Sequence, residues 1–414
     1  MKKLLIIILA MICQFGYGQN WQSINSPTSK NIRSCSFIDK DLGWIITQDS
    51  IFKTTDGGNT WTNQTYPPTP AFNSRHFNSI HFINQNVGVI GCGNYLYTGV
   101  DQSQVSSILW TNDGGNTWEY KHLGGQNSYI IDAKLASPTV AYAVAQYGKL
   151  KKTTDGGNTW TNANYTSYYT GSQLFPINQD IVYFAGLNNI LFGGAFGSTV
   201  NGGANWMVTP VSNDTSMQAI YFTDGMIGWL GGYNGEILAT SNGGASWTPC
   251  STSTTGNISG IAFRNNIIGW ATTNAGEILK TIDGGSNWIT EYNQNSGLSA
   301  ISFPGMDTIG YAVGDSGMIL KYTYLTSAQS PVVTSELQVF PNPANSKITI
   351  MSDYFNKPNS TITIHNILGK KVITQKSLGN PSQLDISSLE NGVYLIRIDN
   401  GKHEIIKRFI KSGK

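Results

Sequence analysis

Short apolar segments separated by polar turns recur along residues 21–324, whereas helical periodicity is nearly absent after the first twenty residues. One set of segments ends in Phe or Leu and lies at 35–37, 80–82, 133–135, 173–175, 220–222, 261–263 and 301–303. A second set pairs a small or β-branched residue with a large apolar one, at 43–44, 88–89, 141–142, 182–183, 228–229, 269–270 and 310–311. A third segment, such as 237–240 or 278–281, leads into a glycine-rich turn. The pattern predicts seven repeated units of short antiparallel strands.

The glycine-rich turn is an octapeptide that occurs six times: TTDGGNTW (54–61), TNDGGNTW (111–118), TTDGGNTW (153–160), TVNGGANW (199–206), TSNGGASW (240–247) and TIDGGSNW (281–288). Its Asp or Asn can accept hydrogen bonds from backbone N–H groups that follow it in a turn, and its two glycines admit positive φ. The final Trp can bury its ring between neighbouring sheets. We therefore assign structural roles, as turn caps and not as catalytic acids, to Asp56, Asp113, Asp155, Asn201, Asn242 and Asp283.

The units outnumber the octapeptides by one. The last unit ends at 319–322 without an octapeptide, whereas Trp21 stands alone near the N-terminus, 40 residues before Trp61, which is one repeat length. Four strands per unit, with small residues on the inner strands, is the geometry of a β-propeller. We therefore predict an all-β fold with a seven-bladed propeller over 19–324, closed by an N-terminal strand that completes the last blade.

The two ends of the chain differ from the repeat region. Residues 1–18 combine two lysines, an apolar run and small residues, which is the order of a secretory signal peptide. Residues 325–336 form a Pro- and Ser-containing linker. Residues 337–414 contain alternating runs at 347–351 and 361–364, which predict a small antiparallel β-sandwich as a second domain. No other apolar run is long enough to be a transmembrane segment.

Both domains resemble known families. The repeat resembles the Asp-box, or bacterial neuraminidase repeat (BNR), propellers of WD40/YVTN-like architecture, and 221–247 and 261–288 are similar to the photosystem II assembly and stability factors. The Asp box is structural and occurs in proteins of many functions, so it implies a fold and no activity.

The tail resembles the C-terminal sorting domain of type IX secretion cargo in LQVFPNPA (337–344), IHNILGKKV (364–372), LENGVYLIRI (389–398) and KRFIK (407–411). This resemblance implies a bacterium of the Bacteroidetes type, recognition of 337–414 by the type IX secretion machinery, and a secreted or cell-surface protein. An adhesive immunoglobulin-like module is the alternative for the tail.

The charge of each region limits the classes of partner that the protein can bind. Residues 19–336 carry 13 basic and 19 acidic side chains, a net charge of −6, whereas 337–414 carry 11 and 5, a net charge of +6. The propeller therefore lacks the basic surface of a nucleic-acid binder.

Cys35, Cys92 and Cys250 allow one disulfide at most. We expect free thiols, and whether Cys35 and Cys92 pair is left open. Ligand spacings for a metal and motifs for a cofactor are both missing from the sequence, so we expect neither.

The longest segments of the propeller, 62–78, 93–107 and 162–171, all belong to one face in this topology. Their aromatic and amide side chains suit an extracellular glycan or a protein loop. We therefore expect a ligand among Arg75, His76, Tyr95, Tyr97, Asp101, Tyr165, Tyr168, Tyr169 and Tyr233. The alternative is that these segments only keep the protein soluble.

Catalysis has two candidate arrangements. A sialidase needs three arginines around the substrate carboxylate, and the propeller has Arg33, Arg75 and Arg264. However, Arg33 precedes an inner strand, Arg264 follows one in a turn at the other face, and the arginine-containing motif that opens sialidase propellers is missing. A glycoside hydrolase needs two carboxyl groups about 5–10 Å apart, for which the expected face offers Asp49, Asp101 and Asp315. We predict a binding or scaffold propeller without catalytic residues, with an extracellular glycoside hydrolase of the Asp-box class as the alternative.

Overall fold

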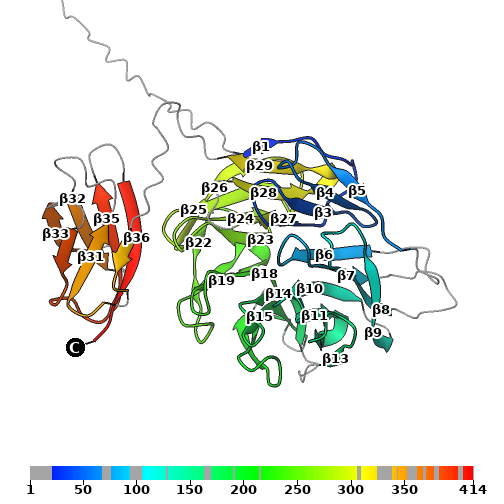
Figure 1. Cartoon of the computed structure of the whole chain (residues 1–414), viewed down its shortest axis with the longest axis horizontal. Coiled ribbons are helices and arrows are strands. Elements are labelled where there is room, and N and C mark those ends of the chain that lie inside the picture. The colour runs from blue at the N-terminus through cyan, green and yellow to red at the C-terminus, as the bar shows by residue number, and fades with distance from the viewer. Residues whose placement is uncertain are drawn as a thin grey trace, which may run out of the picture. The chain divides into compact units, whose positions relative to one another are not determined.

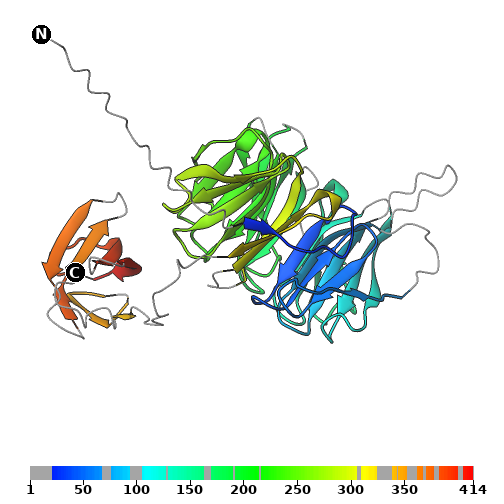
Figure 2. The same cartoon turned by 90° about the horizontal axis from the view of Figure 1, so that it is seen from above.

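The computed structural model describes residues 21–67, 76–93, 105–126, 129–162, 169–189, 192–213, 216–304, 309–323, 338–342, 344–351, 361–366, 370–376, 382–399 and 404–413. The chain divides into two compact units, Met1–Leu325 and Thr326–Lys414. In the first unit, sheets are arranged around a common axis as the blades of a propeller (Figures 1 and 2).

The first unit contains seven sheets among its described residues, and each sheet is one blade. Blade 1 consists of β2 (Ser34–Phe37), β3 (Gly43–Ile46), β4 (Ile51–Thr54) and β5 (Thr62–Gln64). Blade 2 consists of β6 (His76–Phe82), β7 (Gly88–Gly93), β8 (Val105–Thr111) and β9 (Glu119–Gln126). Blade 3 consists of β10 (Ile130–Leu135), β11 (Ala141–Ala145), β12 (Lys149–Thr153) and β13 (Thr161–Asn162).

Blades 4 to 6 continue the same antiparallel order. They are β14 (Tyr169–Pro176), β15 (Val182–Asn188), β16 (Gly194–Thr199) and β17 (Met207–Ser212); β18 (Met217–Phe222), β19 (Gly228–Gly232), β20 (Ile237–Thr240) and β21 (Thr248–Pro249); and β23 (Ile258–Phe263), β24 (Gly269–Thr273), β25 (Glu277–Thr281) and β26 (Asn287–Asn293). A short strand, β22 (Ser251–Thr252), adds in parallel to β26. Single 3-10 turns follow the second strands of blades 3, 5 and 7: η1 (Gln146–Gly148), η2 (Tyr233–Gly235) and η3 (Asp315–Gly317).

Blade 7 joins the two ends of the propeller sequence. It consists of β27 (Leu298–Ser302), β28 (Ile309–Gly314), β29 (Ile319–Thr323) and the N-terminal β1 (Trp21–Ser23). β1 pairs antiparallel with β29, with Trp21 opposite Tyr322, and Figure 1 shows the two strands side by side. The predicted all-β, seven-bladed propeller closed by the N-terminal strand is confirmed.

The glycine and the aromatic residue that open a second strand have separate packing tasks. A Cβ on Gly43 would lie 2.1 Å from Cδ1 of Phe37 in the same blade, so glycine leaves room for that ring. The next residue, Trp44, stacks on Phe82 of blade 2 with ring centroids 3.5 Å apart. Equivalent stacks join Trp229 to Phe263, Trp270 to Phe303 and Tyr311 to Phe37 at 3.7, 4.2 and 3.6 Å. The motif thereby packs each of these blades on the next.

Polar side chains of the inner strands connect neighbouring blades. The first strand of a blade has one edge without a strand partner, so some of its N–H groups need another acceptor. Side chains of the preceding blade supply it at 2.8–3.1 Å: Ser36 to Phe82 N, Ser79 to Ala133 N, His81 to Leu135 N, Asp132 to Leu174 N and Gln173 to Ile220 N. The sequence analysis did not identify these residues, although polar residues within the inner segments were the available signal.

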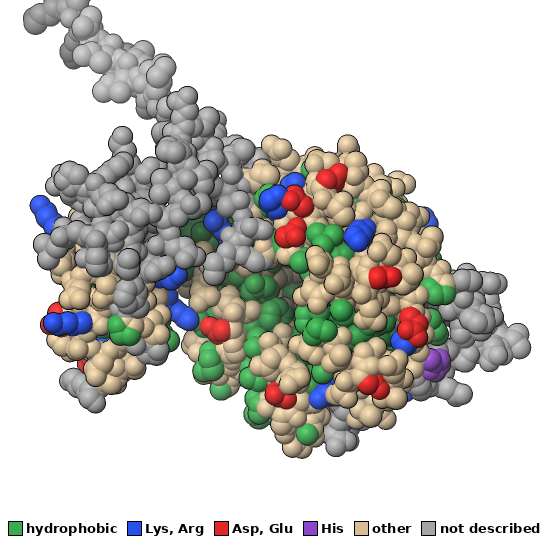
Figure 3. Space-filling view, in the orientation of Figure 1, with side chains coloured by type: hydrophobic (Ala, Val, Ile, Leu, Met, Phe, Trp, Pro, Cys, Tyr) green, Lys and Arg blue, Asp and Glu red, His purple; other side chains and the backbone are tan. Residues whose placement is uncertain are grey.

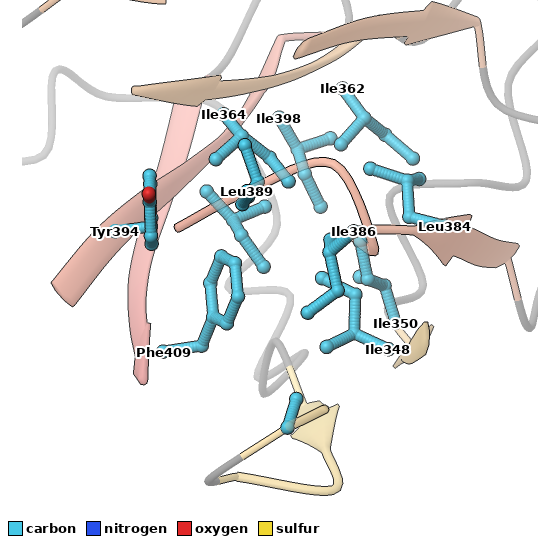
Figure 4. Close-up of a cluster of buried hydrophobic side chains, with 12 residues drawn as sticks. Ile348, Ile350, Ile362, Ile364, Leu384, Ile386, Leu389, Tyr394, Ile398 and Phe409 are labelled. Atoms are coloured by element: carbon cyan, nitrogen blue, oxygen red, sulfur yellow. The ribbon is translucent and has the colours of Figure 1, made fainter. Parts of the chain in front are cut away.

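The second unit is a small antiparallel sandwich, as predicted. One sheet contains β30 (Gln338–Phe340), β31 (Lys347–Met351) and β34 (Ser382–Asp385), and the other contains β33 (Lys371–Lys376), β32 (Thr361–Asn366), β35 (Gly392–Asp399) and β36 (Glu404–Lys411). Ile348 and Ile350 of the first sheet face Ile362, Ile364 and Phe409 of the second in one buried cluster (Figure 4). This unit therefore has a hydrophobic core of its own.

Candidate ligand-binding face

Antiparallel strand order gives the propeller two distinct faces. The box face holds the octapeptide turns and the turns between first and second strands, which bond to each other, as in Gly57 N to Asp41 O at 2.8 Å. The loop face is the opposite end, where second strands turn into third strands and one blade leads into the next. The connections from β5 to β6, β7 to β8 and β13 to β14 leave from strand ends at the loop face. Two of these connections, 65–75 and 94–104, are the longest between strands of the propeller.

The octapeptide turns are satisfied by their own side chains. Asp56 Oδ1 accepts hydrogen bonds from Thr60 N and Thr54 Oγ1, both at 2.9 Å, while Thr54 Oγ1 accepts from Gly58 N at 2.8 Å. Hydrogen bonds from Thr60 above all lower the pKa of Asp56 to about 2. Gly57 and Gly58 have φ of 68° and 86°, in the left-handed region that glycine tolerates. The opening threonine was not singled out in the sequence, although all six copies begin with it.

The same pattern recurs where the central residue is an amide. Asn242 Oδ1 accepts from Ser246 N at 3.0 Å, and Asn242 Nδ2 donates to Ser246 Oγ at 2.8 Å. Asn201 Oδ1 likewise accepts from Asn205 N at 3.0 Å. In these turns the side-chain oxygen of Asn therefore accepts the same backbone hydrogen bond, from the residue four positions later, that the Asp carboxylate accepts.

Most of the predicted ligand-binding residues lie outside the described residues. These are Arg75, Tyr95, Tyr97, Asp101, Tyr165 and Tyr168, together with the side chain of Tyr169, whose backbone begins β14. His76 begins β6, and Tyr233 lies in η2, so the structure places both on the loop face, in blades 2 and 5.

His76 belongs to a polar group where blades 1 and 2 meet. Its Nε2 lies 2.6 Å from Gln48 Nε2. Burial lowers the pKa of His76, the positive charge of Arg33 lowers it further, and the negative charge of Asp49 raises it by less. The imidazole is therefore neutral near pH 7 and accepts a hydrogen bond from the Gln48 amide. Arg33 Nη1 donates to Asn78 Oδ1 at 3.0 Å.

Asp49 is engaged within the same region. Burial would raise the pKa of Asp49, but hydrogen bonds from Lys30, Ser50 and Thr47 outweigh it and hold the pKa below its ordinary value. The Lys30 Nζ to Asp49 Oδ2 distance is 2.6 Å. A carboxyl group with a lowered pKa is ionised at neutral pH and is a poor general acid. This arrangement fits a turn-capping role.

Blades 5 and 7 present matching turns on the loop face. Asn234 and Ser316 have φ of 54° and 55°, and each turn receives an asparagine from a neighbouring blade. Asn257 Oδ1 accepts from Asn234 N at 3.1 Å, and Asn31 Oδ1 accepts from Ser316 N at 2.9 Å. Tyr233 is 42% exposed beside the first of these turns, which leaves an aromatic surface open to a ligand.

The arginines of the sialidase alternative do not converge. Arg33 immediately precedes β2 at the loop face, whereas Arg264 follows β23 in a turn at the box face and donates its backbone N–H to Ile268 O. Arg75 lies outside the described residues. Arg33 and Arg264 therefore cannot bind the same carboxylate, because they lie on opposite faces of the propeller.

The inner strands of blades 1 to 3 carry titratable groups that the sequence analysis left unused. Asp132 and Lys134 form an ion pair at 3.5 Å. Burial, with a smaller effect of Lys134, lowers the pKa of His81 to about 3, and burial raises the pKa of Cys35 to about 12. Both groups are neutral at pH 7, and the thiol is unreactive as a nucleophile. Within the described residues, Cys35, Cys92 and Cys250 are not joined by disulfide bonds.

In the described part of the chain, no group of three or more His, Cys, Asp and Glu side chains is arranged to hold a metal ion. Within the same residues, no helix has the length and apolar character needed to cross a membrane. Figure 3 shows scattered single charges on one side of the propeller, with hydrophobic side chains gathered near the centre of the ring.

Comparisons with known proteins agree with the two-part architecture. Residues 338–412 match the family described as secretion system C-terminal sorting domain, and residues 15–106 match photosynthesis system II assembly factor YCF48. No curated protein matches the chain significantly.

Solved structures extend the likeness to the whole ring. YCF48 bound to a D1 peptide is 22% identical, with a TM-score of 0.60 over 74% of this chain and 96% of that chain. YCF48 from Cyanidioschyzon merolae is 20% identical, with a TM-score of 0.57 over 73% and 98%. A GH74 xyloglucanase from Xanthomonas campestris is 11% identical, with a TM-score of 0.59 over 93% and 68%. At these identities the likeness establishes the fold and no activity.

The sorting domain gives the location, because a domain of this type directs its protein through type IX secretion to the cell surface or the extracellular space. The chain is a seven-bladed β-propeller, similar in fold to the YCF48 assembly factors, that carries a type IX secretion C-terminal sorting domain.

Proposed function

We propose that this extracellular protein is a binding or scaffold propeller without catalysis, and that its loop face holds a glycan or protein ligand. The observation that carries the proposal is the asymmetry between the two faces. Box turns close on their own hydrogen bonds, whereas the two longest connections between propeller strands, 65–75 and 94–104, both leave from the loop face. Ordering extra residues costs about 1–2 kcal/mol each, which favours connections that serve a purpose.

The chemistry of the described loop face supports binding more than hydrolysis. Tyr233 offers an exposed ring, and Asn78, Gln48 and Asn257 offer amides, the groups that stack on sugars and pair with hydroxyls. Asp49 is held as an ionised turn cap.

A glycan array probed with residues 19–414, with a parallel assay for released reducing sugar, tests this proposal. We expect binding without release, and Tyr233→Ala should weaken binding about fivefold, a loss of about 1 kcal/mol. Val200→Ser is the matched control, because Val200 is 73% exposed on the box face. A ligand that is sensitive to Val200→Ser and insensitive to Tyr233→Ala would show that the loop face is the wrong surface.

An extracellular glycoside hydrolase is the second candidate, favoured by the fold shared with the xyloglucanase over 93% of this chain. Asp315 on η3 and Asp101, which lies outside the described residues, are the acids left once Asp49 is set aside. Release of reducing sugar that disappears in Asp315→Asn or Asp101→Asn, with the fold intact, would establish hydrolysis and refute the binding-only proposal.

A further inference from the structure

The inner rim of the loop face carries one cation among neutral side chains. In six blades the strand pairing skips one residue of the inner strand, and these residues are Asn78, Ile131, Ser172, Gln218, Ser259 and Ser299. Arg33 precedes β2 at the corresponding place in blade 1, next to Ile32, whose backbone N–H bonds to Gly314 O of blade 7. All seven side chains are partly buried.

The Arg33 guanidinium has no carboxylate partner among the described residues. Its side-chain hydrogen bond goes to the neutral amide oxygen of Asn78, and Arg33 takes part in none of the ion pairs within the described residues. Asp49, an acid of the same region, pairs with Lys30. Burial lowers the pKa of Arg33, and no charge among the described residues offsets this effect. A partly buried charge without a counter-charge is unfavourable, and an anion from outside would remove that cost.

Guanidinium chemistry defines the class of anion. Five N–H donors in a planar fork match the two oxygens of a carboxylate, and the Asn78 contact uses one of the donors. The surrounding groups are amides and a neutral imidazole, which pair with hydroxyls. The propeller region has a net charge of −6, so it repels a densely charged polyanion. A single carboxylate in an otherwise neutral, hydroxyl-rich ligand fits all three conditions.

We propose that Arg33 binds the carboxylate of an acidic sugar within a largely neutral glycan, at the inner rim of the loop face. The inference rests on the proposed function, because it names the ligand class of the same face. It assigns to Arg33 a binding role that neither its place in the repeat nor its hydrogen bond to Asn78 requires.

The first test needs no ligand. Arg33→Gln keeps an N–H donor for Asn78 and removes the charge, so the melting temperature of the 19–414 chain should stay constant or rise by about 1–3 °C. A fall of more than about 3 °C would show that the guanidinium stabilises the fold, and would overturn the proposal.

The second test uses galacturonate-containing oligosaccharides, each paired with its carboxyl-reduced neutral counterpart. The wild-type chain should prefer the acidic member about tenfold or more. Arg33→Gln should abolish this preference and leave binding of the neutral member, and Arg33→Lys should retain only part of it because the planar fork is lost. Arg264→Gln on the box face is the matched control and should change neither.

Other outcomes separate the inference from the proposed function. Equal binding of acidic and neutral members, unaffected by Arg33→Gln, would overturn the inference and leave the binding function standing. Arg33-dependent binding of a peptide with a free C-terminal carboxylate, but not of its amidated form or of any glycan, would overturn the sugar assignment. Binding of neither class would refute the proposed function, and the inference with it.

Discussion

Lys53 of blade 1 donates to Gly114 O in the box turn of blade 2 at 3.0 Å, whereas Lys280 of blade 6 donates to Glu291 Oε1 of its own blade at 2.6 Å. Lys152 and Lys321 follow the first pattern, with the carbonyl oxygens of Gly202 and Gly57 in the next blade as acceptors. Lys280 has no such acceptor ahead of it, because blade 7 contains no octapeptide. At the closing junction a carboxylate replaces the missing box carbonyl.

The same carboxylate secures the strand that closes the ring. Glu291 Oε2 accepts the indole N–H of Trp21 at 3.1 Å and that of Trp270 at 2.8 Å. Trp21 packs edge-on against Phe303 at 5.9 Å, as Trp61 of an octapeptide packs against Phe37 at 6.4 Å. The comparison shows that a partly buried carboxylate can take the place of a box turn at one junction of a propeller, provided that it bonds to groups on both sides of that junction.

Replacing Trp21 by Ala should have the largest effect on stability. We expect a loss of about 3–5 kcal/mol in the free energy of unfolding, since the side chain is only 2% exposed and holds β1 against two blades. Urea unfolding followed by circular dichroism measures it. Trp61→Ala is the control and should cost less, because Trp61 is only partly buried and its Nε1 has no partner within the described chain. Equal losses would show that the closing Trp is no different from a box Trp.

Glu291→Gln should have an intermediate effect, about 1–3 kcal/mol, because it removes the charge that serves Lys280 and both indoles. Glu119→Gln is the control, since Glu119 pairs with Lys121 but its side chain is 67% exposed, so a change of about 0.5 kcal/mol or less is expected. The two free energies of unfolding, measured at pH 7, decide the point. If the Glu291 variant were as stable as the Glu119 variant, the Glu291 carboxylate would not stabilise the closing junction.

The pH dependence of the Glu291 effect follows from Lys280. Burial lowers the pKa of Lys280, but its hydrogen bond to Glu291 and the charge of Glu291 raise it above the ordinary 10.5. A raised lysine pKa stabilises the fold fully below 10.5, and this contribution is lost as pH rises through the higher folded value. The stability gap between wild type and Glu291→Gln should therefore narrow above pH 10.5, as pH-dependent urea midpoints would show.

Asp56→Asn should have the smallest effect at pH 7, because Asn242 makes the equivalent bonds in blade 5. A pKa near 2 against an ordinary 3.8 means that the stabilisation by Asp56 is present above 3.8 and disappears as pH falls through 2. Melting curves of wild type and variant should therefore converge between pH 4 and 2. Unfolding of the variant at neutral pH would contradict the turn-cap role.

The sequence determined the blade count, the order of strands and the closing role of Trp21, because each signal is local and repeated. The octapeptide encodes its own turn within eight residues, as the bonds between Thr54, Asp56 and Thr60 show. The spacing from Trp21 to Trp61 made the N-terminal segment the outer strand of blade 7, and β1 confirms it. The sandwich core of 337–414 followed from simple alternation.

The candidate site was only partly predictable. His76 and Tyr233 lie on the expected face, while six predicted residues and the Tyr169 side chain lie outside the described residues. Arg33 entered the sequence analysis only as a sialidase arginine. Its lack of a counter-charge among the described residues could not be inferred, because the sequence does not say whether Lys30 or Arg33 pairs with Asp49.

Tertiary structure alone decided which groups meet across blades. Glu291 lies 270 residues from Trp21 in the sequence. The repeat does not predict its role, because lysines at other junctions bond to a carbonyl oxygen in the octapeptide of the next blade. Asp132 and His81 likewise became acceptors for N–H groups of the next blade, 42 and 54 residues away. A turn is determined by hydrogen bonds among neighbours in the chain, which sequence shows directly. The contact between Glu291 and Trp21, by contrast, depends on closure of the ring, which brings β1 within reach of blade 6.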